Sequence, residues 1–149
     1  MLRPAILATL LAFAPMAVAQ APAPPADTRY LVEMPELQQQ LLRREMQEHL
    51  LAYQRILGHL ANGELAAAGE VAEQTMGVST MGKHAAATRG LGGPGRFMPD
   101  GMRQMAFGMH EAATDFARVT KEDDLGAALR ALQDLTGICA ACHMAYRTR

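Results

Sequence analysis

The sequence predicts an all-α fold, an antiparallel bundle of four helices, and three observations support this class. Apolar side chains recur at steps of three and four residues in four separate segments, as on the buried face of an amphipathic helix. Stretches rich in Gly, Pro or Asp separate these segments, and no alternating pattern of useful length predicts a strand. Four helices with short or modest connections favour antiparallel neighbours.

The first residues have the pattern of a cleaved export signal. Arg3 supplies a positive charge, an apolar run follows at 6–14, and Ala-Val-Ala at 17–19 matches a cleavage site of small residues. The run is shorter than the roughly 20 residues that a membrane-spanning helix needs. We therefore expect residues 1–19 to be a signal peptide and the mature protein to be periplasmic, with no membrane attachment.

The mature chain is expected to have an extended leader at 20–33, which begins Pro- and Ala-rich, and one helical domain at 34–149. The first helix is predicted from Pro35 to about Asn62. Its predicted apolar stripe comprises Leu37, Leu41, Leu42, Met46, Leu50, Tyr53, Leu57 and Leu60.

Three more helices are expected after the first. A second runs from about 64 to about 87, and the Gly- and Pro-rich stretch at 89–96 follows as a loop. Pro99 opens a third helix, which ends by about 120. Asp123 or Asp124 caps the fourth, whose apolar stripe runs straight into Cys139. The stripe comprises Leu125, Ala128, Leu129, Leu132, Leu135 and Ile138.

The segment Cys139-Ala-Ala-Cys142-His143 has the C-x-x-C-H spacing of a c-type haem attachment site. Residues three apart lie on nearly the same face of a helix, so both thiols can form thioethers along one edge of a porphyrin. The imidazole of the next residue can then approach the iron. A redox disulfide motif normally opens a helix after a strand, and a structural zinc site needs four ligands, so both alternatives fit less well. The sequence predicts one covalent haem c.

The motif and its position near the end of the fourth helix resemble the class II c-type cytochromes, the family of cytochrome c-prime and its low-spin relatives. The specific part of the resemblance is CAACHMAYR at 139–147. The resemblance implies an antiparallel four-helix bundle, a basic residue near a haem propionate at the position of Arg147, and homodimers through the early helices. The sequence itself leaves the oligomeric state open.

Low-spin members of that family take a sixth iron ligand from a Met on the first helix, and Met46 is the matching candidate. An Arg that often precedes this Met by four residues is replaced by Leu42, which puts the register in doubt. His49, one turn further along, is the chief competitor and is expected at the bundle edge. A Met46-ligated iron implies an electron carrier with redox proteins as partners. An open position implies binding of NO or CO.

Other functions have weaker support. A net charge of −1 gives no reason to expect nucleic acid as a partner. The chain shows no telling carboxylate pair, nucleophile motif or phosphate loop, so we expect no enzyme. A Met-rich face could instead bind copper(I) through soft thioethers, although Met more often fills gaps in a core. That face comprises Met98, Met102, Met105 and Met109.

Overall fold

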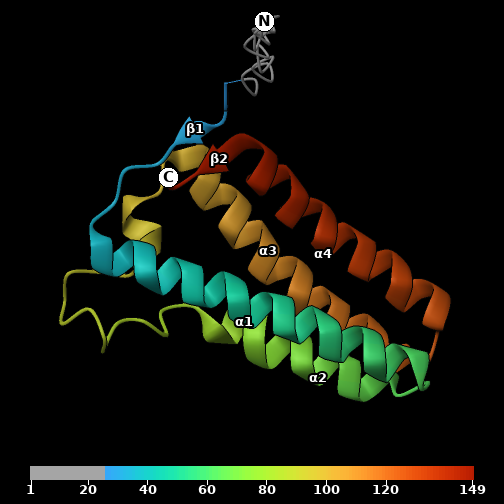
Figure 1. Cartoon of the computed structure of the whole chain (residues 1–149). Coiled ribbons are helices and arrows are strands. Elements are labelled where there is room, and N and C mark those ends of the chain that lie inside the picture. The colour runs from blue at the N-terminus through green and yellow to red at the C-terminus, as the bar shows by residue number, and fades with distance from the viewer. Residues whose placement is uncertain (1–25) are drawn as a thin grey trace, which may run out of the picture.

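The computed structural model describes residues 26–149 (Figure 1). The predicted signal peptide and the start of the predicted leader lie outside the described residues. The described part is 72% helical, with four long helices and almost no strand, which confirms the all-α prediction. Within this part, no helix is both long enough and apolar enough to cross a membrane.

The first helix, α1, spans Glu36–Ala61, as predicted, but its buried face differs from the predicted Leu stripe. Leu37, Leu50 and Leu57 of that stripe are exposed to solvent. A helix with apolar residues on several faces buries the face that its neighbours cover, and periodicity alone cannot select that face. The face that α1 buries comprises Gln38, Leu42, His49, Ala52, Ile56 and Leu60.

The second helix, α2, spans Leu65–Met76 and ends about ten residues earlier than predicted. The backbone turns extended at Gly77, where a Cβ would overlap the carboxylate of Glu73. That carboxylate accepts hydrogen bonds from the backbone N–H and the hydroxyl of Ser79, which hold the chain in a turn beyond the helix. Turns and two short 3-10 segments, Val78–Thr80 and Pro94–Phe97, occupy the stretch before the next helix.

The last two helices begin where the sequence predicts. The third, α3, spans Asp100–Val119 directly after Pro99, and a 3-10 turn at Thr120–Glu122 follows it. The fourth, α4, spans Leu125–Ala145. Its N-cap is Asp124, whose carboxylate accepts a hydrogen bond of 3.0 Å from the N–H of Ala127, two residues into the helix.

Consecutive helices pack against each other as α1–α2, α2–α3 and α3–α4, whereas α1 and α4 make few direct contacts. The main core includes Ile56, Phe116 and Leu135 at its centre. In Figure 1, α1 and α4 run in opposite directions and diverge toward the end where the two strands lie. The divergence leaves the C-terminal part of α4 uncovered by α1.

The two strands consist of two residues each and close that diverging end. Tyr30–Leu31 (β1) pairs in parallel with Tyr146–Arg147 (β2), and the N–H of Val32 donates to the carbonyl of Arg147 at 2.8 Å. Val32 is only 2% exposed and packs in a second core cluster with Leu42, Met98 and Met102. The end of the predicted leader is therefore packed into the helical domain.

Candidate haem site

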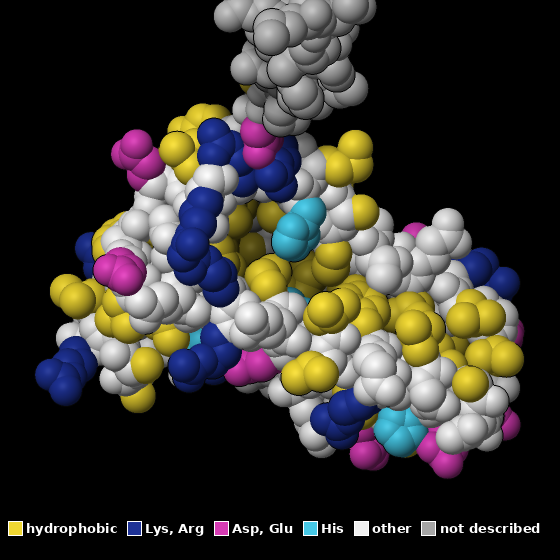
Figure 2. All heavy atoms as spheres, in the orientation of Figure 1, with side chains coloured by type: hydrophobic (Ala, Val, Ile, Leu, Met, Phe, Trp, Pro, Cys, Tyr) yellow, Lys and Arg dark blue, Asp and Glu magenta, His cyan; other side chains and the backbone are white. Residues whose placement is uncertain are grey.

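A cavity of about 500 Å³ lies between the diverging parts of α1 and α4, with α3 as its floor. Figure 2 shows the opening as a hollow with an apolar interior, bordered by basic side chains and a histidine. The volume lies in the range of about 300–1,000 Å³ that is common for small-molecule and cofactor sites. The apolar wall includes Leu42, Met46, Met98, Met102, Met109 and Ile138.

Cys139 and Cys142 line this cavity from α4, half-buried and not joined by a disulfide. They continue the buried stripe of that helix at steps of three and four residues, from Leu132 and Leu135 through both cysteines to Tyr146. The stripe faces protein as far as Leu135, and beyond that point it faces the cavity. The same helix face therefore builds the core and then presents two thiols to one space.

Burial favours the protonated forms of the Cys142 thiol and the Tyr53 phenol beside the cysteine pair. Burial raises the pKa of the Cys142 thiol. The hydroxyl of Tyr53 on α1 lies 3.5 Å from Sγ of Cys139, and burial together with this contact raises the pKa of the phenol. A thiol with a raised pKa is a poor nucleophile at neutral pH, so the environment of Cys142 does not favour its thiolate form.

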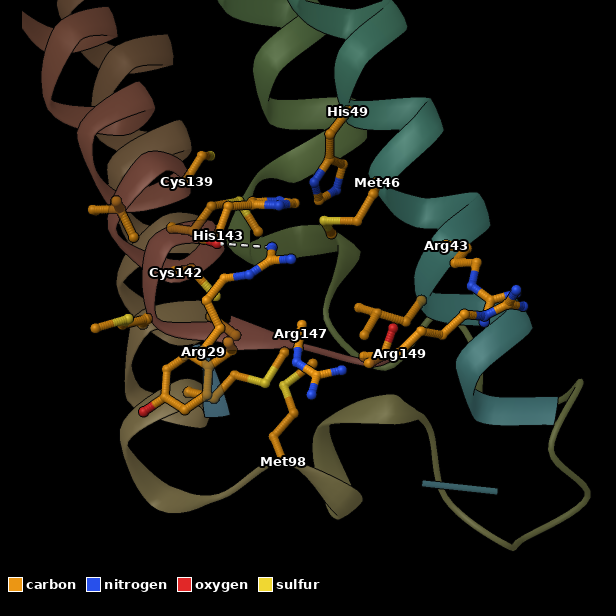
Figure 3. Close-up of a pocket in the computed structure, with 18 of the residues that line it drawn as sticks. Arg29, Arg43, Met46, His49, Met98, Cys139, Cys142, His143, Arg147 and Arg149 are labelled. Atoms are coloured by element: carbon orange, nitrogen blue, oxygen red, sulfur yellow. Dashed lines mark hydrogen bonds between the residues drawn. The ribbon is translucent and has the colours of Figure 1, made fainter. Parts of the chain in front are cut away.

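His143 follows Cys142 directly and stands at the mouth of the cavity, with an exposed side chain. In Figure 3 its side chain extends from α4 toward the side of the cavity where Met46 and His49 project from α1. Its backbone carbonyl accepts a 3.4 Å hydrogen bond from the guanidinium of Arg29. The structure thus brings together the four residues predicted to attach and ligate a haem: Met46, Cys139, Cys142 and His143.

His49 lies inside the cavity wall, and the expectation that it stands at the bundle edge is wrong. Its side chain is 94% buried, and Nε2 has no hydrogen-bond partner among the described residues. Burial lowers its pKa to about 4, an effect that the nearby carboxylate of Glu45 opposes. The imidazole is therefore neutral at pH 7 and has a lone pair that can bind a metal.

Four arginines surround the mouth: Arg29, Arg43, Arg147 and Arg149. Arg29 forms a 2.7 Å ion pair with Asp27, and this hydrogen-bonded guanidinium holds the pKa of the carboxyl at about 2. Nε of Arg147 lies 3.5 Å from the same carboxylate, yet it is buried and makes no hydrogen bond within the described chain. Of the four, sequence analysis identified Arg147 alone, because only strand pairing brings Arg29 to the mouth.

These residues fit the shape and chemistry of a haem. The apolar wall suits the porphyrin face, the guanidinium groups suit the two propionates, and the two thiols can form thioethers. Within the described residues, three buried polar side-chain atoms have no hydrogen-bond partner, and two of them, His49 Nε2 and Arg147 Nε, belong to side chains that line this cavity. A metal could bind His49 Nε2, and a carboxylate could accept a hydrogen bond from Nε of Arg147, whose contact with Asp27 is an ion pair of 3.5 Å.

The Met-rich face that predicted a copper site lines the same cavity. Met98, Met102 and Met109 are buried and Met105 is half-buried, and all four contribute to its wall. The residues that the structure describes include no group of three or more His, Cys, Asp or Glu arranged to hold a metal ion.

A second cavity of about 300 Å³ shares part of this wall, including Met46, His49, Met98 and Met109. On its far side, Glu45 pairs with Lys83 at 3.0 Å and with the imidazole of His84 at 3.4 Å.

A scan against protein-family models finds no match. A search of curated proteins and a search of solved structures also find none. The functional assignment therefore rests on the residues that line the cavity.

Proposed function

We propose that the protein is an exported monohaem c-type cytochrome that transfers single electrons. The observation that carries this proposal is that Cys139, Cys142 and His143 of the C-x-x-C-H motif line one apolar cavity, whose mouth is bordered by arginines. Cys139 and Cys142 attach the haem, His143 is one axial ligand, and Arg147 pairs with a propionate.

The protein's own residues set the conditions for electron transfer. The bound haem supplies the one-electron chemistry at its iron. The buried methionines of the cavity wall exclude water, and the guanidinium groups at the mouth balance the charge of the propionates. Since His143 and the arginines stand at the opening, redox partner proteins meet the cofactor at this end of the molecule.

The fold in this proposal is an antiparallel four-helix bundle that the haem completes. The helices α1 and α4 would close the bundle, but they diverge beside the cavity, where side chains alone leave the space unfilled. A flat, apolar group between them would bury the walls of both helices. This explains how a chain with no Trp and only 5% aromatic residues fills its interior.

The second axial ligand in this proposal comes from α1. Met46, the candidate from sequence, and His49 both line the cavity opposite α4. Either would complete a six-coordinate iron, the arrangement of an electron carrier.

The alternative function is gas binding, in which the far side of the iron stays open to NO or CO. The observation that favours it is the second cavity, because only side chains separate it from the first. This space is large enough to hold a diatomic molecule beside Met46 and Met98, which line both cavities.

Covalent attachment tests the proposal directly. The full chain is produced in a host that attaches haem c, and the secreted form is then denatured and analysed by mass and by haem staining. We expect one haem increment that survives denaturation and is lost in the double variant C139S/C142S. The matched control A140S/A141S changes the two residues between the cysteines and should keep the haem. A secreted protein without covalent pigment would refute the proposal.

A further inference from the structure

The contact between Tyr53 and Cys139 sets the alignment of α1 with α4. The two helices run in opposite directions, so four residues back along α1 correspond to four residues forward along α4 (Figure 1). Each step of four advances about 6 Å along a helix. His49 on α1 and His143 on α4 therefore each lie four residues beyond this contact, toward the strands, and both line the same cavity (Figure 3).

Met46 lies about one helical turn further toward the strands. It is seven residues from Tyr53, as Tyr146 is from Cys139. Met46, like Cys142 and Tyr146, packs against the core cluster that includes Val32. Met46 therefore already has the neighbours of a core side chain.

His49 has an unmet requirement that Met46 does not. Most buried polar groups in proteins have a hydrogen-bond partner, because a buried group without one loses the hydrogen bonds that it would make with water. Nε2 of His49 is buried and has no such partner within the part of the chain that the structure describes. The thioether of Met46 is only a weak acceptor and loses little when it is buried in apolar surroundings.

From these observations we infer that His49, and not Met46, is the second axial ligand of the haem iron. The inference rests on the proposed haem attachment. His143 and His49 then hold the iron from α4 and α1, so the cofactor crosslinks the two helices that diverge. Since a Met ligand raises the reduction potential relative to His, a protein with two His ligands has a lower potential than its Met-ligated counterpart.

Absorption and electron paramagnetic resonance spectra of the haem-loaded, secreted protein test this inference. We expect wild type to be low-spin in both oxidation states and to lack the weak long-wavelength band of an Fe(III)–thioether bond. M46L, which keeps the side-chain volume, should have the same spectra. H49A should become high-spin and bind carbon monoxide when reduced, and added imidazole should restore the low-spin spectrum.

A third variant should add an absorption band, and its result does not require the fold to tolerate the empty space that H49A leaves. His49→Met should produce the thioether band and raise the reduction potential. A low-spin wild-type spectrum that persists in H49A and H49M but is lost in M46L would overturn the inference in favour of Met46. High-spin wild-type protein that binds carbon monoxide would overturn it in favour of an open iron. These results all require covalent pigment in wild type, whose absence would instead refute the haem proposal.

Discussion

The phenolic oxygen of Tyr53 lies 3.5 Å from Sγ of Cys139, and this contact joins α1 to α4 beside the cavity. Both side chains are partly buried and pack against the main core. Y53F should lower the free energy of unfolding by about 0.5–1.5 kcal/mol, because the sulfur loses its hydroxyl partner. Urea titration of the purified protein measures this change. Y30F is the control, since the ring of Tyr30 is 61% exposed and the stability should stay unchanged.

Close packing of α2 on α3 requires a glycine at position 69. A Cβ there would overlap the hydroxyl of Thr120 and lie 3.1 Å from Cα of Ala117. G69A should therefore destabilise the protein by about 1–3 kcal/mol, despite the higher helix propensity of Ala. G58A is the matched control, because nothing lies within 4 Å of the added Cβ in α1. We expect it to stabilise by about 0.5–1 kcal/mol, and equal effects of both substitutions in thermal unfolding would contradict the packing argument.

Glu73 should make the stability depend on pH in the acid range. Hydrogen bonds from the hydroxyls of Ser79 and Thr114, each 2.6 Å long, lower its pKa from 4.5. Because the folded pKa is the lower one, this stabilisation is present above pH 4.5 and is lost as the pH falls through the folded value. E73Q should cost about 1 kcal/mol at pH 7 and reduce the acid dependence of urea unfolding. The control is E70Q on the exposed face of α2, which should leave the stability at pH 7 unchanged.

The chain before α1 contributes to stability through Val32. Its side chain is buried beside Leu42, Met98 and Met102 at the strand end of the cavity. V32A removes two methyl groups and should cost about 2 kcal/mol, while L31A on the exposed neighbour should cost far less. If chemical denaturation shows equal losses for both variants, Val32 does not pack as the structure indicates.

Arg147 should raise the reduction potential of the haem-loaded protein. A cation near the iron favours the reduced state, which has one positive charge fewer. At an effective dielectric constant of about 20 and a separation of about 10 Å, the removed charge contributes about 1–2 kcal/mol, or about 40–80 mV. R147Q should lower the midpoint potential in a redox titration by about this amount. R55Q, at an exposed position of α1 outside the cavity lining, should leave the potential within a few millivolts of wild type.

The sequence by itself determined the helical class, the starts of α1, α3 and α4, and the C-x-x-C-H residues. These features follow from local chemistry. Proline favours a helix start, as at Pro35 and Pro99. The carboxylate of Asp124 caps its own helix. The spacing of the two cysteines places them on one face of a helix.

Only the tertiary structure decided which face of α1 is buried, where α2 ends and which residues meet at the cavity. Each of these depends on groups distant in sequence, such as the helices that cover α1, or the pairing of β1 with β2 that brings Arg29 to the mouth. The burial of His49 shows the difference most clearly. A polar residue on a helix has no preferred side until other helices pack around it, so no local pattern could predict its unpartnered imidazole inside the cavity.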